Sequence, residues 1–125
     1  RQLGKALARL LVDLDLEEAK PFLKPPYGGF LTLYSLAAVR WDISLSDAAS
    51  GFLWMWAENK VLCAMKLIPL GQTDGQKILS TVIETISNEV AQGLDLQDDA
   101  IGYSAPGQGI ASALHETQYT RLFRS

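Results

Sequence analysis

Helical periodicity is the feature that most restricts the fold of this chain. Apolar residues recur at spacings of three and four through four segments, and no segment has the strict alternation of a half-buried strand. The first segment carries five leucines on one helical face: Leu3, Leu7, Leu10, Leu11 and Leu14. We therefore predict an all-α fold, a single helical domain of about five helices, and we expect it to dimerise.

Prolines and glycines separate the first two predicted helices. The first helix covers about residues 1–14, and Lys20-Pro21 and Pro25-Pro26 predict an extended link after it, because proline lacks an amide donor. The second, from residue 27 or 28 to about 41, is apolar nearly all round and should be buried. Gly28 and Gly29 at its start predict a close approach of two helices.

The third predicted helix has two apolar stripes. Ser44 or Ser46 can cap its start, and it should run to about residue 68. One stripe comprises Leu53, Ala57, Val61, Ala64 and Ile68, and the other Ser50, Trp54, Val61 and Met65. Two stripes suggest two packing partners, the domain's own core and a second subunit, although a central core helix would have the same pattern.

A polar turn introduces the fourth predicted helix. Thr73 and Gln76 fit a capping box, in which each side chain satisfies an exposed amide, and Gly93 fits the residue just after the helix. Gln72 and Gln76 could face a partner or water. Residues 94–109 predict a loop with one short turn, and a last helix should begin at about residue 110. This divides the chain into a helical domain, 1–109, and a C-terminal helix with a partner-binding tail, 110–125.

Composition excludes several classes of function. A net charge of −3 and a pI near 5.0 provide no basic surface for nucleic acid. The single cysteine, Cys63, cannot form an intrachain disulfide and favours a reducing compartment, so we expect a cytoplasmic protein. The long apolar stretch at 52–70 is interrupted by charged residues, which argues against a membrane span. Because the chain opens on Arg1 in a helical pattern without a cap, we interpret it as the C-terminal part of a longer helical protein.

No motif predicts catalysis or metal binding. The glycines of residues 71–77 lack the spacing of a phosphate-binding loop. His115 and Glu116 could form an acid/base pair, but neighbours on a helix point in different directions, and a structural histidine is the stronger interpretation. A metal site shared by His115 of two subunits stays open as an alternative. We therefore expect no catalytic residue, no metal site and no cofactor.

The C-terminal tail has the composition of a binding anchor. Tyr119, Leu122 and Phe123 lie among Arg121 and Arg124 at the chain end. Tyrosine and arginine are enriched in binding hot spots, and terminal segments commonly become ordered only when a partner binds. The alternative is a last helix that folds back on the domain's own core.

Two separate motifs resemble the urease accessory protein F family. Residues 67–76, LIPLGQTDGQ, form the first, and Ala111-Ser112, HETQY at 115–119 and RLFRS at 121–125 form the second, in the family's order. The segments RQLGKALARL and PPYGGFLTLYSLAA resemble the family's middle helices more loosely. The resemblance covers the whole chain, although the N-terminal portion of the family is absent and Gly109 stands where relatives often have an acidic residue.

The resemblance implies an all-helical, non-catalytic cytoplasmic chaperone for nickel insertion into apo-urease. Members dimerise, bind the accessory protein called H or D, and with it recruit the GTPase accessory protein G. Nickel is handled by the wider complex, so the chain needs no cofactor of its own. A generic helical dimerisation or adaptor domain, and a small helical enzyme that uses His115 and Glu116, are the alternatives.

The resemblance also assigns roles to particular residues. It places a dimer contact at Ser50 and Trp54 on the third helix. The expected partner-binding residues lie in the polar turn and in the tail: Gln72, Thr73, Asp74, Gln76, His115, Glu116, Gln118, Tyr119, Arg121, Leu122, Phe123 and Arg124.

Overall fold

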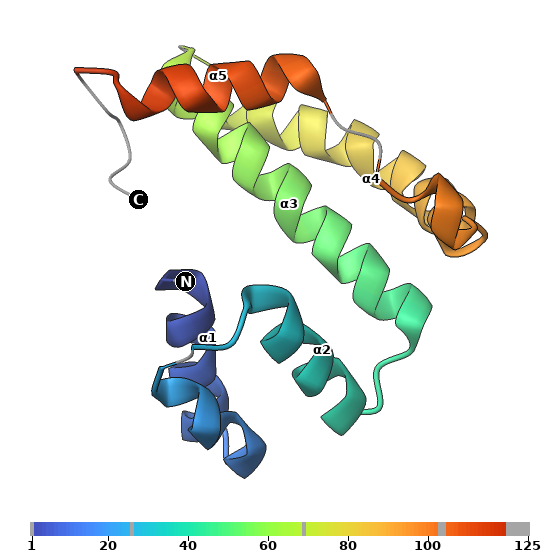
Figure 1. Ribbon diagram of the computed structural model, residues 1–125. Helices are drawn as coiled ribbons and strands as arrows, with labels where there is room; N and C mark the ends of the chain where they lie inside the picture. The colour runs from blue at the N-terminus through green and yellow to red at the C-terminus, as the bar shows by residue number, and fades with distance from the viewer. Residues whose placement is uncertain (1, 26, 69, 103–104, 120–125) are drawn as a thin grey trace. The chain divides into compact units, whose positions relative to one another are not determined.

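The computed structural model describes residues 2–25, 27–68, 70–102 and 105–119, and every regular element in these ranges is helical (Figure 1). The all-α prediction is confirmed, and the dimer stays a prediction. The elements are α1 (Gln2–Asp13), η1 (Glu17–Leu23), α2 (Phe30–Arg40), α3 (Leu45–Leu67), α4 (Gln72–Leu94), η2 (Asp98–Ala100) and α5 (Pro106–Glu116). They form two compact units, Arg1–Leu94 and Asp95–Ser125.

The core of the first unit lies between α1, η1 and α2. Its buried members are Ala8, Leu11, Leu16, Ala19, Leu33 and Ala37. Leu11 and Leu33 are its largest fully buried side chains. Full burial of one leucine contributes about 1.5–3 kcal/mol, so these two residues dominate the apolar stabilisation of the α1–α2 pair.

The sequence predicted an extended link after α1, and this prediction is wrong for most of the link. Glu17–Leu23 forms a 3₁₀ helix with Pro21 inside it. A short 3₁₀ helix makes few amide hydrogen bonds, so it tolerates a proline. Burial of Ala19 holds the segment against the core, and an ion pair between Glu18 and Arg40 ties it to α2. The backbone becomes extended only at Lys24.

Gly4 and Gly28 mark a close approach of two backbones, which bears out the prediction only in part. Gly29 is exposed and uncrowded, and Gly28 lies in the segment before α2 rather than in a helix. Gly4 and Gly28 are both buried. A Cβ added to Gly4 would overlap the carbonyl oxygen of Gly28, and a Cβ added to Gly28 would overlap the ring of Phe22. Side chains are therefore excluded at both positions, and main-chain atoms set the separation between α1 and the segment before α2.

Helix α2 is buried on one side only, so the prediction of a helix buried all round is wrong. Leu33, Ala37 and Ala38 are buried, whereas Leu31 and Val39 are exposed. The apolar residues of α2 do surround the helix, but its neighbours are α1 on the core side and, over a few positions, α3.

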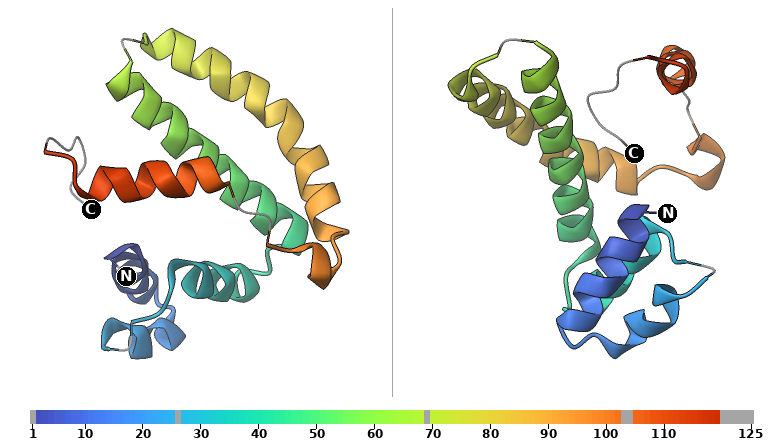
Figure 2. Two further views of the ribbon diagram at one scale, coloured as in Figure 1. Left: turned by 45° about the horizontal axis from the view of Figure 1, so that its top comes forward. Right: turned by 90° about the vertical axis from the view of Figure 1, so that its left-hand side faces the viewer.

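Helices α3 and α4 lie side by side as a hairpin (Figures 1 and 2). The side chain of Ser44 caps α3, because its Oγ accepts a hydrogen bond from the Asp47 amide at 3.1 Å, as the sequence predicted for one of two serines. Buried residues of the hairpin come from both helices: Ala57, Val61, Gly75, Leu79, Ile86 and Val90. Of the two predicted stripes, only Ala57 and Val61 become buried, and the remaining stripe residues are half-buried or exposed.

The predicted capping box at the start of α4 is wrong. The helix begins at Gln72, so Thr73 lies inside the first turn, and the carbonyl of Gly71 accepts from the amides of Asp74 and Gly75, both at 3.1 Å. Gly93 is likewise inside α4, which ends at Leu94. The helix therefore extends beyond both residues that local sequence rules place at its ends.

Tyr34 connects α2 to α3. Its hydroxyl donates to the carbonyl of Ala48 at 2.7 Å, and its ring packs against Phe30 and Phe52 with centroid distances of 6.0 Å. A Cβ added to Gly51 would lie 3.0 Å from the Tyr34 hydroxyl oxygen, so the glycine provides room for this contact.

We expect Tyr34→Phe to lower the free energy of unfolding by about 0.5–1.5 kcal/mol, because it removes a half-buried hydrogen bond and retains the ring. Urea denaturation followed by circular dichroism measures the change. Tyr27→Phe is the matched control, since Tyr27 contacts Lys5 through its ring, and its effect should be a few tenths of a kcal/mol. Equal stability of the Tyr34 variant and the parent chain would show that the hydroxyl contributes nothing.

The second unit contains η2 and α5. Helix α5 begins at Pro106, a residue that suits the first turn of a helix because its missing amide hydrogen is unpaired there in any case. The predicted start at about residue 110 is thus too late, and the predicted division after Gly109 falls within a helix. No side chain of α5 is buried in the described part of this unit. None of the described helices is both long and apolar enough to cross a membrane.

Candidate partner-binding surfaces

The polar turn predicted to bind a partner forms the exposed start of α4. Gln72, Thr73, Asp74 and Gln76 all lie in the first five residues of this helix and are exposed. Oδ1 of Asp74 lies 3.8 Å from Nζ of Lys77. The negative charge of Asp74 complements the positive end of the helix dipole. Because the capping box is not formed, the Thr73 and Gln76 side chains are not bound to each other's amides and are accessible to a partner.

The predicted tail residues that the structure describes lie at the end of α5. His115 and Glu116 occupy its last turn, and Gln118 follows, with its amide donating to the carbonyl of His115 at 3.2 Å. All are exposed, and the Tyr119 side chain is fully exposed. The other predicted tail residues lie outside the described residues: Arg121, Leu122, Phe123 and Arg124.

Helix α5 carries an apolar face that the sequence analysis did not assign to a site. Ile110 and Leu114 are one turn apart on this helix, and both are exposed. Residues at i and i+4 share a helical face, so their spacing was the signal that could have identified them. Together with Tyr119 they provide large apolar side chains for a binding partner.

Ser50 and Trp54, the predicted dimer residues, lie one turn apart on α3. They border a hollow of about 440 Å³ with Gly51 and, from α4, Ile83, Ile86 and Ser87. Both residues are half-buried. The structure thus brings them to one place beside α4, and their contact with a second subunit stays a prediction.

The described residues offer no cluster suited to a metal ion. No group of three or more His, Cys, Asp or Glu side chains lies close enough together within the described ranges. Cys63 is half-buried, and its Sγ lies 3.8 Å from Oδ1 of Asn59.

His115 and Glu116 occupy adjacent positions of α5. The first turn of α4 and the end of α5 belong to different compact units.

The described helices define an all-helical protein with an exposed polar helix start on one unit and exposed apolar side chains on the other. The family model UreF matches residues 1–83. The chain is also 54% identical over its whole length to the urease accessory protein UreF of Alkalilimnicola ehrlichii, and 46% identical over its whole length to that of Hahella chejuensis. The chain belongs to the UreF family of urease accessory proteins.

The relatives are longer than this chain. The matches cover 55% of the Alkalilimnicola protein and 56% of the Hahella protein. A third relative, from a Marinomonas strain, is 42% identical over 98% of the chain, which covers 53% of that protein. The chain thus spans little more than half the length of the curated relatives it matches. Comparison with solved structures gives no match.

Proposed function

We propose that this chain acts as a non-catalytic chaperone and scaffold in urease maturation. It binds the H/D-type accessory protein, and the pair recruits the G-type GTPase for nickel insertion into apo-urease in the cytoplasm. Membership of a family whose members are named urease accessory proteins supports this role. The chain would act as a homodimer, with Ser50 and Trp54 at the contact, and would hold no cofactor of its own.

The observation that carries the proposal is the exposure of the α5 unit. Tyr119, Ile110 and Leu114 are large apolar side chains that no described part of the chain covers. Tyrosine and apolar anchors provide much of the energy of protein–protein binding when a partner removes them from water. The exposed polar start of α4 supplies a second binding element, which suits a scaffold with more than one partner.

Co-elution with the H/D-type accessory protein tests the proposal. We expect the chain to form a complex in size-exclusion chromatography with light scattering, and a version that ends at Gln118 to lose it. Helix α5 ends at Glu116, so the shortened version should keep its helices, which circular dichroism checks. Leu3→Ala, a change at an exposed residue of α1, is the control and should leave the complex intact.

Three results would contradict the proposal. Co-elution of the version that ends at Gln118 would remove the tail as anchor and favour a generic helical adaptor domain. Failure of the folded full chain to co-elute would show that it does not bind the H/D-type protein by itself. Catalytic turnover by the chain alone, lost in His115→Ala, would instead favour the enzyme alternative.

A further inference from the structure

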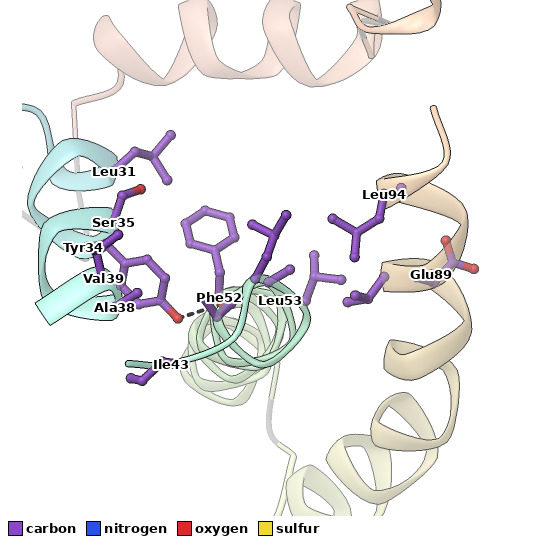
Figure 3. A pocket seen from close by; sticks show the side chains of 15 residues that line it. Leu31, Tyr34, Ser35, Ala38, Val39, Ile43, Phe52, Leu53, Glu89 and Leu94 are labelled. Carbon is purple, nitrogen blue, oxygen red and sulfur yellow. Dashed lines mark hydrogen bonds between the residues drawn. The ribbon is translucent and has the colours of Figure 1, made fainter. Parts of the chain in front are cut away.

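A large apolar groove lies on the first unit, and none of the described residues of that unit fills it. Helix α3 forms its floor, and α2 and α4 form its walls (Figure 3). The hollow has a volume of about 540 Å³. Its principal apolar side chains are Leu31 and Val39 of α2, Phe52 of α3, and Val90 and Leu94 of α4. We call it the α2–α3–α4 groove.

The groove leaves much apolar surface in water. Val39 is 75% exposed and Leu31 is 59% exposed, although both lie on a helix whose opposite face forms the core. Apolar area exposed to water raises the free energy by roughly 25 cal/mol per Å² relative to buried area. A contiguous apolar patch of this kind commonly marks a contact with another polypeptide.

The chemistry of the groove favours a polypeptide over a small molecule. Small-ligand sites contain several convergent polar groups that fix the ligand's orientation. Here the Tyr34 hydroxyl already donates to Ala48, and Ser35 and Glu89 are the other polar side chains at the edge. Such a lining can hold apolar side chains but provides little that would orient a small polar ligand.

Gly93 indicates how closely the occupant approaches. This glycine lies inside α4, where it costs about 0.5–1 kcal/mol relative to alanine, and it keeps a helical backbone without positive φ. An added Cβ would meet no atom within 4 Å, in contrast to the crowded Gly4 and Gly75. Open space beside a groove glycine fits the close approach of a second backbone.

We propose that the α2–α3–α4 groove seats an amphipathic helix from the part of the UreF chain that the longer relatives have and this sequence does not span. The relatives provide the necessary extra chain, since the matches cover only 55% and 56% of their lengths. A second copy of this chain fits less well, because a two-fold contact through this surface would place one concave groove opposite another.

The groove also specifies what the helix looks like. Three converging helices leave space for one further helix, whose apolar residues recur at spacings of three and four on the buried face. Glu89 is the charged residue at the edge, and no ion-pair partner of it lies within the described residues. A lysine or arginine beside the apolar face of the seated helix would lie within reach of Glu89.

Binding of the relatives' additional segment to this chain tests the proposal. The portion of the Alkalilimnicola relative that lies outside the match is labelled with a fluorophore and titrated with the chain, and anisotropy reports binding. We expect a one-to-one complex that Val39→Lys weakens roughly tenfold or more, because binding would then bury a lysine charge. Leu3→Lys is the matched control, since Leu3 is 71% exposed on α1 and lies outside the groove, and it should bind normally.

A second pair of variants separates a blocked groove from a misfolded chain. Gly93→Leu points into open space in this chain and should leave its helical content unchanged, yet weaken binding of the segment. Ala91→Leu, at an exposed position of the same helix outside the groove, should not weaken binding of the segment. The proposal is overturned if the folded chain does not bind the segment, or if Val39→Lys and Leu3→Lys bind it equally. Self-association that Val39→Lys abolishes, without binding of the segment, would overturn it in favour of a second copy.

None of these measurements involves the H/D-type protein, the GTPase or urease. The groove proposal can therefore fail while the proposed function holds, and the reverse is also possible.

Discussion

Leu33→Ala should lower the free energy of unfolding by about 2–5 kcal/mol, the range typical of a large-to-small change in a core. Leu33 lies on α2 and is fully buried in the core that α2 forms with α1 and η1. A smaller side chain there leaves a cavity that the packed neighbours cannot close. A small domain has a total stability of only about 5–15 kcal/mol. The variant should therefore unfold at a much lower urea concentration than the parent chain.

Leu31→Ala is the matched control for this prediction. It makes the same chemical change two residues away on the same helix, but Leu31 is exposed to water. Its effect should be within about 0.5 kcal/mol. Equal effects of the two substitutions would mean that α2 presents a different face to the core, and with it a different wall to the groove.

Gly4→Ala should destabilise the chain by about 1–2 kcal/mol, although alanine is the better helix former. Its Cβ would overlap the carbonyl oxygen of Gly28, which is a main-chain atom and cannot move aside by a change of rotamer. The helix-propensity gain of about 0.5–1 kcal/mol offsets only part of this cost. Thermal and urea unfolding measure the difference.

Gly93→Ala provides the opposite result for the same substitution. Gly93 also lies within a helix, but an added Cβ meets no atom within 4 Å. The variant should be more stable than the parent by about 0.5–1 kcal/mol. A stabilising effect of alanine at both positions would contradict the close contact between α1 and the segment before α2.

Local sequence rules predicted the helices well but placed several of their ends wrongly. Leucine spacing identified α1, and Ser44 identified the start of α3, because both signals depend on neighbours within one or two turns. Thr73 and Gly93 are equally good local signals, yet α4 extends past both. Pro21 lies in a 3₁₀ helix that burial of Ala19 stabilises. In that 3₁₀ segment tertiary packing overrides a local preference.

The candidate surfaces were predictable only in part. Tyr119 and the residues of the α4 turn could be selected from their types and from the family motifs. They are exposed in the structure, and their binding of a partner stays a prediction. The apolar groove could not be predicted, because Leu31, Phe52 and Val90 come from three helices whose convergence no local pattern encodes. The composition of residues 27–41 is the same whether neighbouring helices cover every side of this segment or only one side.

The contact between Gly4 and Gly28 also affects how this fold can evolve. A larger residue at position 4 cannot be accommodated by a smaller one at position 28, because position 28 is already glycine and Phe22 fills the space beside it. Position 4 therefore lacks a compensating substitution at position 28 and should drift far less than the leucines of the same core. Relatives in which that core has been repacked should still keep the same spacing of α1 from the segment before α2.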